Sequence, residues 1–136
     1  MLAETIIKIA LNEVLENLTL GYKVAPENVE IDWNLQEPFI RTYDQPVIKK
    51  QASLGPDGAN LHVGIFHIEI CHPSKIGIIN PLEIAELILP NYERGKNLIY
   101  DGNKILCERA EIKTAYTENS WYILPIHVRY SAYMEN

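Results

Sequence analysis

Two hydrophobic periodicities divide this chain, and together they restrict it to a mixture of helix and sheet. In the first 20 residues, apolar side chains recur every three to four positions, as they do along one side of an amphipathic helix. From residue 29 the apolar positions mostly alternate with polar ones and are rich in β-branched and aromatic types, which is typical of strands. The sequence therefore predicts an α+β fold, with two main helices packed on one face of a mostly antiparallel, mixed β-sheet.

The N-terminal segment is predicted to form a helix that stops at Gly21. Its apolar stripe consists of Ile6, Ile7, Ala10, Leu11, Val14, Leu15 and Leu18. Polar residues fill the opposite arc, but Ile9 projects among them. A single exposed isoleucine usually has no function on a globular protein, yet Ile9 would also suit a contact with a neighbouring subunit.

Strands are predicted at residues 29–33, 39–54, 60–72, 97–100, 104–115 and 121–133. Pro46 cannot donate a ladder hydrogen bond, so its segment should be an edge strand or contain a bulge. In 60–72 the inward-facing phase switches near Ile65, which a bulge or burial on both faces would explain. Turns are expected at residues 55–58 and 101–103, the second of which would close a hairpin.

A second helix is predicted from Asn80 to about Leu89. Asn80 is an N-cap acceptor, Pro81 follows where a missing N–H costs nothing, and Glu83 completes the start signal. Pro90 then restricts the residue before it. Its apolar residues surround most of the helix: Leu82, Ala85, Ile88 and Leu89 are expected to face inward, with Ile84 and Leu87 on the flanks. A helix with so much apolar surface indicates an interface, so Ile9, Ile84 and Leu87 are the candidate subunit contacts.

Composition excludes several classes of partner. A chain of 136 residues supports one core, so residues 1–136 are expected to form a single domain. The formal net charge of -6 opposes binding to phosphate backbones or anionic lipid, and no apolar run is long enough to span a bilayer. We therefore expect no specific nucleic-acid binding and no membrane contact. Because no export signal is visible, Cys71 and Cys107 should be buried reduced thiols in the cytosol, with a disulfide between neighbouring strands as the alternative.

No pattern of residues indicates catalysis or a cofactor. The densest set of possible metal ligands is His62, His67, Cys71 and His72. On a strand His62 and His67 point to opposite faces, and the same-face pair His62 and His72 lies roughly 33 Å apart at about 3.3 Å per residue, too far to share a zinc ion. Serine elbows and phosphate-binding glycine loops are also absent. We expect no metal, no cofactor and no enzymatic activity.

The order of segments resembles the lambda-like minor tail protein U family and related phage tail terminators along nearly the whole chain. After the N-terminal helix come a tryptophan–asparagine pair and a proline–phenylalanine pair. A strand leading into a proline-containing loop follows, then an aromatic-x-x-glycine after the second helix, and a tryptophan that opens the last strand. The positions that carry the resemblance are Trp33, Asn34, Pro38, Phe39, Gly77, Gly95, Trp121 and Tyr130. The gap at residues 35–37 is slightly longer than the family's pattern.

The resemblance implies a structural protein of the virion, assembled in the bacterial host cytoplasm. Its copies would form a hexameric ring at the head-proximal end of the tail, contacting the tail tube protein on one side and a head-completion or neck protein on the other. The nearest alternative is a neck or head-completion protein of the same virion. A small metal-dependent enzyme and an adaptor domain with no role in the virion are more distant alternatives.

Overall fold

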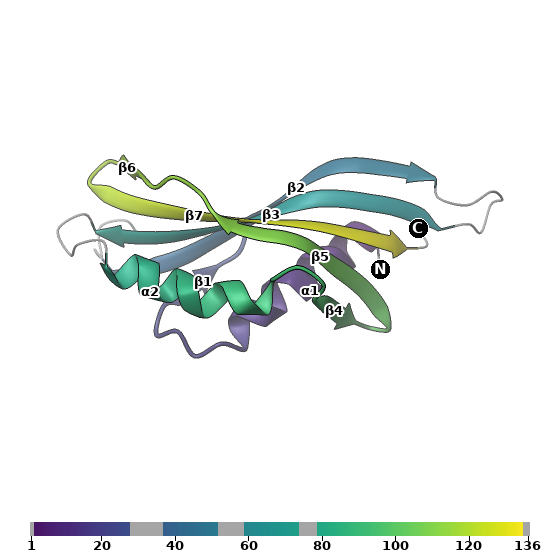
Figure 1. Cartoon of the computed structure of the whole chain (residues 1–136), viewed down its shortest axis with the longest axis horizontal. Coiled ribbons are helices and arrows are strands. Elements are labelled where there is room, and N and C mark those ends of the chain that lie inside the picture. The colour runs from purple at the N-terminus through teal and green to yellow at the C-terminus, as the bar shows by residue number, and fades with distance from the viewer. Residues whose placement is uncertain (1, 28–36, 52–58, 74–78, 135–136) are drawn as a thin grey trace.

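The computed structural model describes residues 2–27, 37–51, 59–73 and 79–134. In chain order its elements are α1 (Ala3–Glu16), β1 (Lys23–Ala25), β2 (Phe39–Gln51), β3 (Asn60–Pro73), α2 (Ile79–Ile88), a 3-10 turn η3 (Leu89–Asn91), β4 (Asn97–Tyr100), β5 (Asn103–Ile112), β6 (Tyr116–Glu118) and β7 (Trp121–Met134). The seven described strands form one sheet, and both helices lie on the same face of it (Figure 1). The predicted α+β class is thereby confirmed.

The sheet is mixed but mainly antiparallel. Its strand order is β1-β2-β3-β7-β5-β4, and β6 pairs with β7 outside this path. Only β1 and β2 run parallel among the described pairs. The central pair, β3 and β7, is in continuous register from Asn60↔Met134 to Pro73↔Trp121. These two long strands therefore form the platform on which the other elements are placed.

The core lies between the helices and the sheet. Ile7, Leu11 and Leu15 of α1 pack in one cluster with Ile68 of β3 and Ile126 of β7. Burial of such side chains contributes about 1.5–3 kcal/mol each to stability. This cluster is closed by Tyr92, whose hydroxyl donates a 2.6 Å hydrogen bond to the Leu11 carbonyl oxygen and so joins the end of η3 to α1.

Two predictions about strand irregularity are resolved by the pairing. The register between β2 and β3 shifts between Pro46 and Ile48, and β1 pairs only with Phe39–Arg41, so Pro46 lies at a bulge on a stretch with no outer partner strand among the described residues. In β3 both alternating sets of side chains are buried from Phe66 to Pro73. The phase switch near Ile65 therefore reflects burial on both faces and requires no break in the pairing with β7.

The element boundaries differ from the predicted ones by small amounts. α1 ends at Glu16, and Gly21 follows in a positive-φ conformation at 73°. α2 begins one residue before the predicted cap, and Pro90 lies inside η3 after the helix has ended. The predicted hairpin is present, because Asp101 and Gly102 both have positive φ and connect β4 to β5, as a two-residue turn of this type requires. The predicted strand at 29–33 and the turn at 55–58 lie outside the described residues.

Candidate assembly surfaces

The outward side of α2 carries exposed leucines between glutamates. Leu87 is 57% exposed and Leu82 is 38% exposed, and Glu83 and Glu86 lie beside them. Ile84 differs from our expectation: it is only 9% exposed and belongs to the core cluster of the same chain. Leu87 and Leu82, and not Ile84, are therefore the apolar residues that this helix offers to another molecule.

α2 is rotated about its axis relative to the orientation expected from the sequence, and this rotation buries Ile84. The buried positions of the helix are Pro81, Ile84, Ala85 and Ile88, which recur at three- and four-residue spacing. Leu82, expected to face inward, is exposed, and Leu89 is half-buried. Ile9 of α1 is also half-buried, so it offers less free surface than Leu87.

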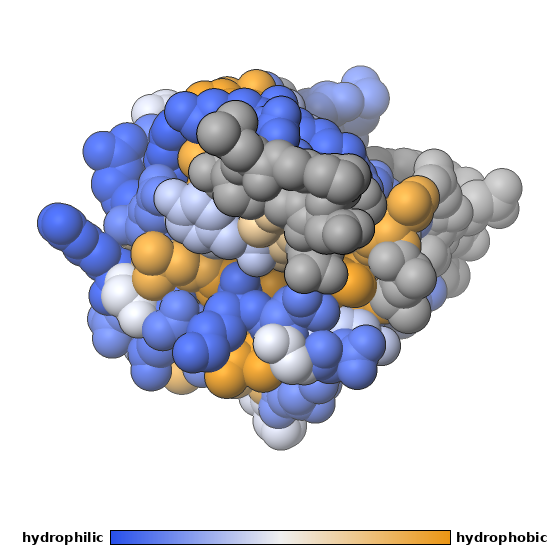
Figure 2. Space-filling view, turned by 90° about the vertical axis from the view of Figure 1, so that its right-hand side faces the viewer, coloured by the Kyte–Doolittle hydropathy of each residue, from blue (hydrophilic) through white to orange (hydrophobic). Residues whose placement is uncertain are grey.

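A second exposed apolar group lies on the sheet face that the helices leave uncovered. Ile99 of β4 is 63% exposed, Tyr133 of β7 is 68% exposed, and Leu106 of β5 lies between their strands. A shallow hollow of about 410 Å³ opens beside Leu106 and Tyr133. Figure 2 looks onto the end of the molecule that lies at the right of Figure 1, and there apolar surface interrupts the hydrophilic surface. The sequence pattern does not predict this group.

The residues that carry the family resemblance form structural contacts where they are described. Phe39 and Trp121 pack edge to face with ring centroids 5.3 Å apart, in a small cluster with Cys71 and Ile123. Gly95 has a φ of 93°, a conformation that favours glycine, and its N–H donates to the Cys107 carbonyl oxygen at 2.9 Å. Pro38 is half-buried next to Phe39. Trp33, Asn34, Gly77 and the loop at 35–37 lie outside the described residues.

The side chain of Tyr130, on β7, lies over Gly64 of β3 and reaches Asp44 of β2. Its hydroxyl donates a 2.6 Å hydrogen bond to Oδ1 of Asp44. A Cβ atom on Gly64, its cross-strand partner, would lie 2.4 Å from the Tyr130 hydroxyl oxygen, so the ring occupies the space that a side chain at Gly64 would fill. Burial raises the pKa of Tyr130 far above its usual range and also raises the pKa of Asp44.

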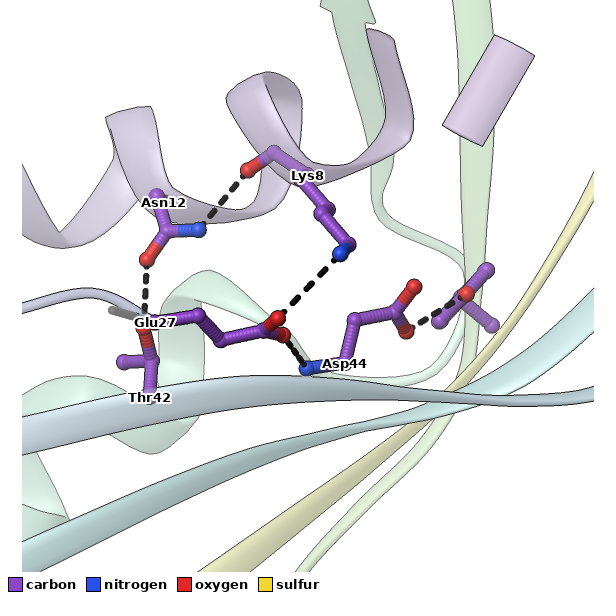
Figure 3. A network of polar contacts seen from close by, with 6 residues as sticks. Lys8, Asn12, Glu27, Thr42 and Asp44 are labelled. Carbon is purple, nitrogen blue, oxygen red and sulfur yellow. Dashed lines mark hydrogen bonds and ion pairs between the residues drawn. The ribbon is translucent and has the colours of Figure 1, made fainter. Parts of the chain in front are cut away.

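Asp44 belongs to a polar network that joins α1 to β2 (Figure 3). Lys8 forms a 3.2 Å ion pair with Oε2 of Glu27, whose Oε1 accepts the backbone N–H of Asp44 at 2.5 Å. Asn12 donates to the Lys8 carbonyl oxygen and accepts from the Thr42 hydroxyl at 2.6 Å. The Glu27 carboxylate thus satisfies a backbone donor on the outer edge of β2, a device that keeps such edges from pairing with other chains.

The histidines are distributed over both faces of the sheet, as alternation along the strand requires. His67 lies on the uncovered face, stacked on Tyr43 and edge to face with His127 at 4.3 Å between ring centroids. His72 faces the helix side, where it contacts the Tyr22 hydroxyl. Burial lowers the pKa of His62, His67 and His72. Within the ranges that the structure describes, no three histidine, cysteine, aspartate or glutamate side chains are close enough to hold a metal ion.

Glu69 is the buried acidic residue of the uncovered face and is fully paired. Arg41 donates to Oε1 of Glu69 at 2.6 Å, and the Tyr116 hydroxyl donates to Oε2 at 2.7 Å. Burial and this bond to a carboxylate raise the pKa of Tyr116 to about 12. Because the Glu69 carboxylate, the Arg41 guanidinium and the Tyr116 hydroxyl already bind one another, this network has a structural role. It also attaches β6, a strand too short and polar to be predicted, to the main sheet.

Both cysteines are free and buried, and they occupy different clusters. Cys107 lies in the main core, whereas Cys71 packs with Phe39 and Trp121 on the other face. Burial raises the pKa of Cys71 to about 12 and that of Cys107 to about 11. None of the described helices is both long and apolar enough to cross a membrane.

The described residues form one extended sheet with two helices on one face and exposed apolar groups on both layers. The model of one family, described as phage tail terminator protein, matches residues 6–130. The chain therefore belongs to the phage tail terminator family, as the order of its segments had indicated. It is a structural protein of the phage tail.

Solved structures support the fold. Seventeen chains match, and one of them has a TM-score of 0.77 with 15% sequence identity, over 100% of this chain and 99% of its own. At that identity the likeness concerns the fold alone. A comparison with curated protein sequences finds no match.

Proposed function

We propose that copies of this chain close into a hexameric ring at the head-proximal end of the phage tail. There the ring ends the addition of tail tube protein and presents its other side to a head-completion or neck protein. The observation that carries this proposal is the family match over residues 6–130. The finer roles are inferences from that membership, and the surfaces described above are consistent with them.

The size of the chain supports assembly from several copies. A folded chain of this length has a radius of gyration of about 14 Å by the usual scaling, so one copy cannot encircle a DNA duplex. Copies that contact one another through two different surfaces can close into a ring. Exposed apolar residues on α2 and on the uncovered sheet face are suitable for such contacts.

The acidic character of the chain suits a channel for DNA. With a net charge of -6, the chain repels phosphates at long range, and weak repulsion favours passage of the genome over retention. A strongly basic inner wall in the assembled ring would contradict this part of the proposal.

The proposal is tested by mixing the purified chain with the tail tube protein of the same phage. Tube length is followed by electron microscopy, and the mass of the complex is measured with and without tube protein. We expect growth to stop when the chain is added and a ring to appear on the tube end, while tube protein alone continues to polymerise. Continued growth at saturating amounts of the chain would contradict the proposal. Docking on the portal complex before any tube is present would indicate a neck protein instead.

A further inference from the structure

One region of the uncovered sheet face combines exposed apolar residues with lysines, and none of the described residues that make it up is acidic. It comprises Ile48, Lys50, Ile99, Lys104, Leu106 and Tyr133, all of which are exposed; we refer to it as the basic sheet face. The pairing joins Lys50 to Leu61, Leu61 to Tyr133 and Ile99 to Lys104. The neighbouring row runs from Ile48 through Val63, Ser131 and Leu106 to Asn97.

Alternation along the strands places this region opposite the helices. Leu98 and Ile105 belong to the core cluster with α1, as do Ala132 and Met134. Ile99, Lys104 and Tyr133 are their immediate neighbours and therefore point to the other face. Neither Lys50 nor Lys104 forms an ion pair with any described residue.

The outward side of α2 has the complementary character. It comprises Leu82, Glu83, Glu86 and Leu87, and we refer to it as the acidic helix face. It contains no lysine or arginine, and neither glutamate forms an ion pair within the described part of the chain. This face lies on the helix layer, whereas the basic sheet face lies on the opposite side of the molecule (Figure 1).

The dimensions of the two faces also match. Lys50 and Lys104 lie on β2 and β5, which are three strand spacings apart, or about 14 Å. An α-helix with its side chains has a diameter of about 10–12 Å. A helix lying between the two lysines would therefore set its leucines over Leu61 and Tyr133, beside Leu106, and its glutamates within reach of the ammonium groups.

We propose that the acidic helix face of one copy docks on the basic sheet face of the next copy. This inference rests on the proposed function and names the surfaces through which the ring would close. The contact is heterologous, because it joins two different regions of the chain, and contacts of this kind generate rings. Charge complementarity within a single sequence identifies a second copy, and not a tube or head protein, as the occupant.

The test reverses the charges on each face in the full-length chain. One variant carries Glu83→Lys and Glu86→Lys, and the other carries Lys50→Glu and Lys104→Glu. A control for the first variant, Glu13→Lys with Glu16→Lys, makes the same charge change as that variant on the exposed side of α1. Because all six side chains are exposed, each variant should keep the stability of the wild type within about 0.5 kcal/mol. Self-association is measured by sedimentation and native mass spectrometry, alone and with tail tube protein.

We expect each reversed variant alone to associate at least about tenfold more weakly than the wild type, because every contact would then oppose like charges. Mixing the two variants should restore assembly in strict alternation. In that mixture, each reversed helix face meets a reversed sheet face and each native face meets a native one. The control should assemble like the wild type, and added salt should reduce the differences by screening.

Three results would overturn the proposal. If both variants assemble as well as the wild type, or if the mixture of the two remains dissociated, the acidic helix face does not bind the basic sheet face. The proposed function would still stand in that case if the wild type formed a ring on the tube. If the variant with Lys50→Glu and Lys104→Glu no longer binds the tube while its self-association is unchanged, the tube protein occupies the basic sheet face. If the wild type forms no oligomer with or without tube protein, the proposed function fails together with this inference.

Discussion

At the centre of the sheet, the ring of Tyr130 fills the space that a side chain on Gly64 would need. Tyr130 fills the position above Gly64 and reaches Asp44 with its hydroxyl, so the glycine is needed for room and not for an unusual backbone angle. The family resemblance identified Tyr130 but not its two partners. The partners come from different strands, and alternation alone cannot specify which residue of a neighbouring strand lies opposite.

We predict that Gly64→Ala destabilises the protein by about 1–3 kcal/mol, because a buried methyl group would overlap the Tyr130 ring. Urea unfolding measures the change. In the double variant Gly64→Ala with Tyr130→Ala the two effects should be less than additive, since the second substitution removes the overlapping ring. Full additivity would show that the methyl group added at Gly64 does not overlap the Tyr130 ring.

The buried histidines should make stability depend on pH. Burial lowers the pKa of His62, His67, His72 and His127 from the ordinary 6.5, so below that pH the unfolded chain binds more protons than the folded one. The free energy of unfolding should therefore be highest above pH 6.5 and fall as the pH is lowered, by up to about 1.4 kcal/mol per pH unit for each histidine. Urea titrations between pH 8 and pH 5 test this. The slope should be shallower in the double variant His67→Gln with His127→Gln, which removes two of the four histidines, and an unchanged slope would show that these two do not contribute to it.

α2 shows how a helix with an uninformative pattern is oriented by what it covers. Its start signal was clear from Asn80, Pro81 and Glu83, but its apolar residues extend around most of its circumference. The sheet selected Ile84, Ala85 and Ile88 as the buried side and left Leu82 and Leu87 outside. The side-chain pattern located α2 in the sequence. The position of β3 and β7 beneath the helix decided which of its sides faces the sheet.

Substitutions on the two sides of α2 should therefore have different consequences. Leu87→Ser should change stability by no more than about 0.5 kcal/mol and weaken association between copies. Ile84→Ala should cost about 2–4 kcal/mol, because it leaves a cavity in the core of the chain. Chemical denaturation and sedimentation of both variants separate the two effects. A large loss of stability in the Leu87 variant would contradict the exposed position of that side chain.

On the scale of the whole molecule, the two cysteines report on both sides of the sheet. We predict that neither thiol reacts with a thiol-specific dye at pH 8 while the protein is folded, because both are buried and burial raises their pKa values to about 12 and about 11. In urea both should become reactive in the same transition, since the strands that carry them both pair with β7. The single variants Cys71→Ala and Cys107→Ala distinguish the two sites. Rapid labelling of either thiol without denaturant would contradict a well-packed sheet.

The sequence by itself determined most of the elements. The two periodicities located α1, α2 and the long strands, the proline in β2 indicated its bulge and open edge, and the Asp101–Gly102 turn located the β4–β5 hairpin. These features depend on neighbours along the chain, whose spacing is fixed by the geometry of helices and strands. The same order of segments identified the family.

Only the tertiary structure decided which surfaces remain free. β1 and β6 are too short to produce a pattern, and they exist because longer strands and the Glu69 network hold them. The burial of Ile84, the exposure of Leu82, and the meeting of Lys50 and Lys104 in one region of the uncovered face all depend on residues brought together from distant parts of the chain. Periodicity gives the relative positions of residues within an element, whereas the rotation and neighbours of that element are set by packing across the whole fold.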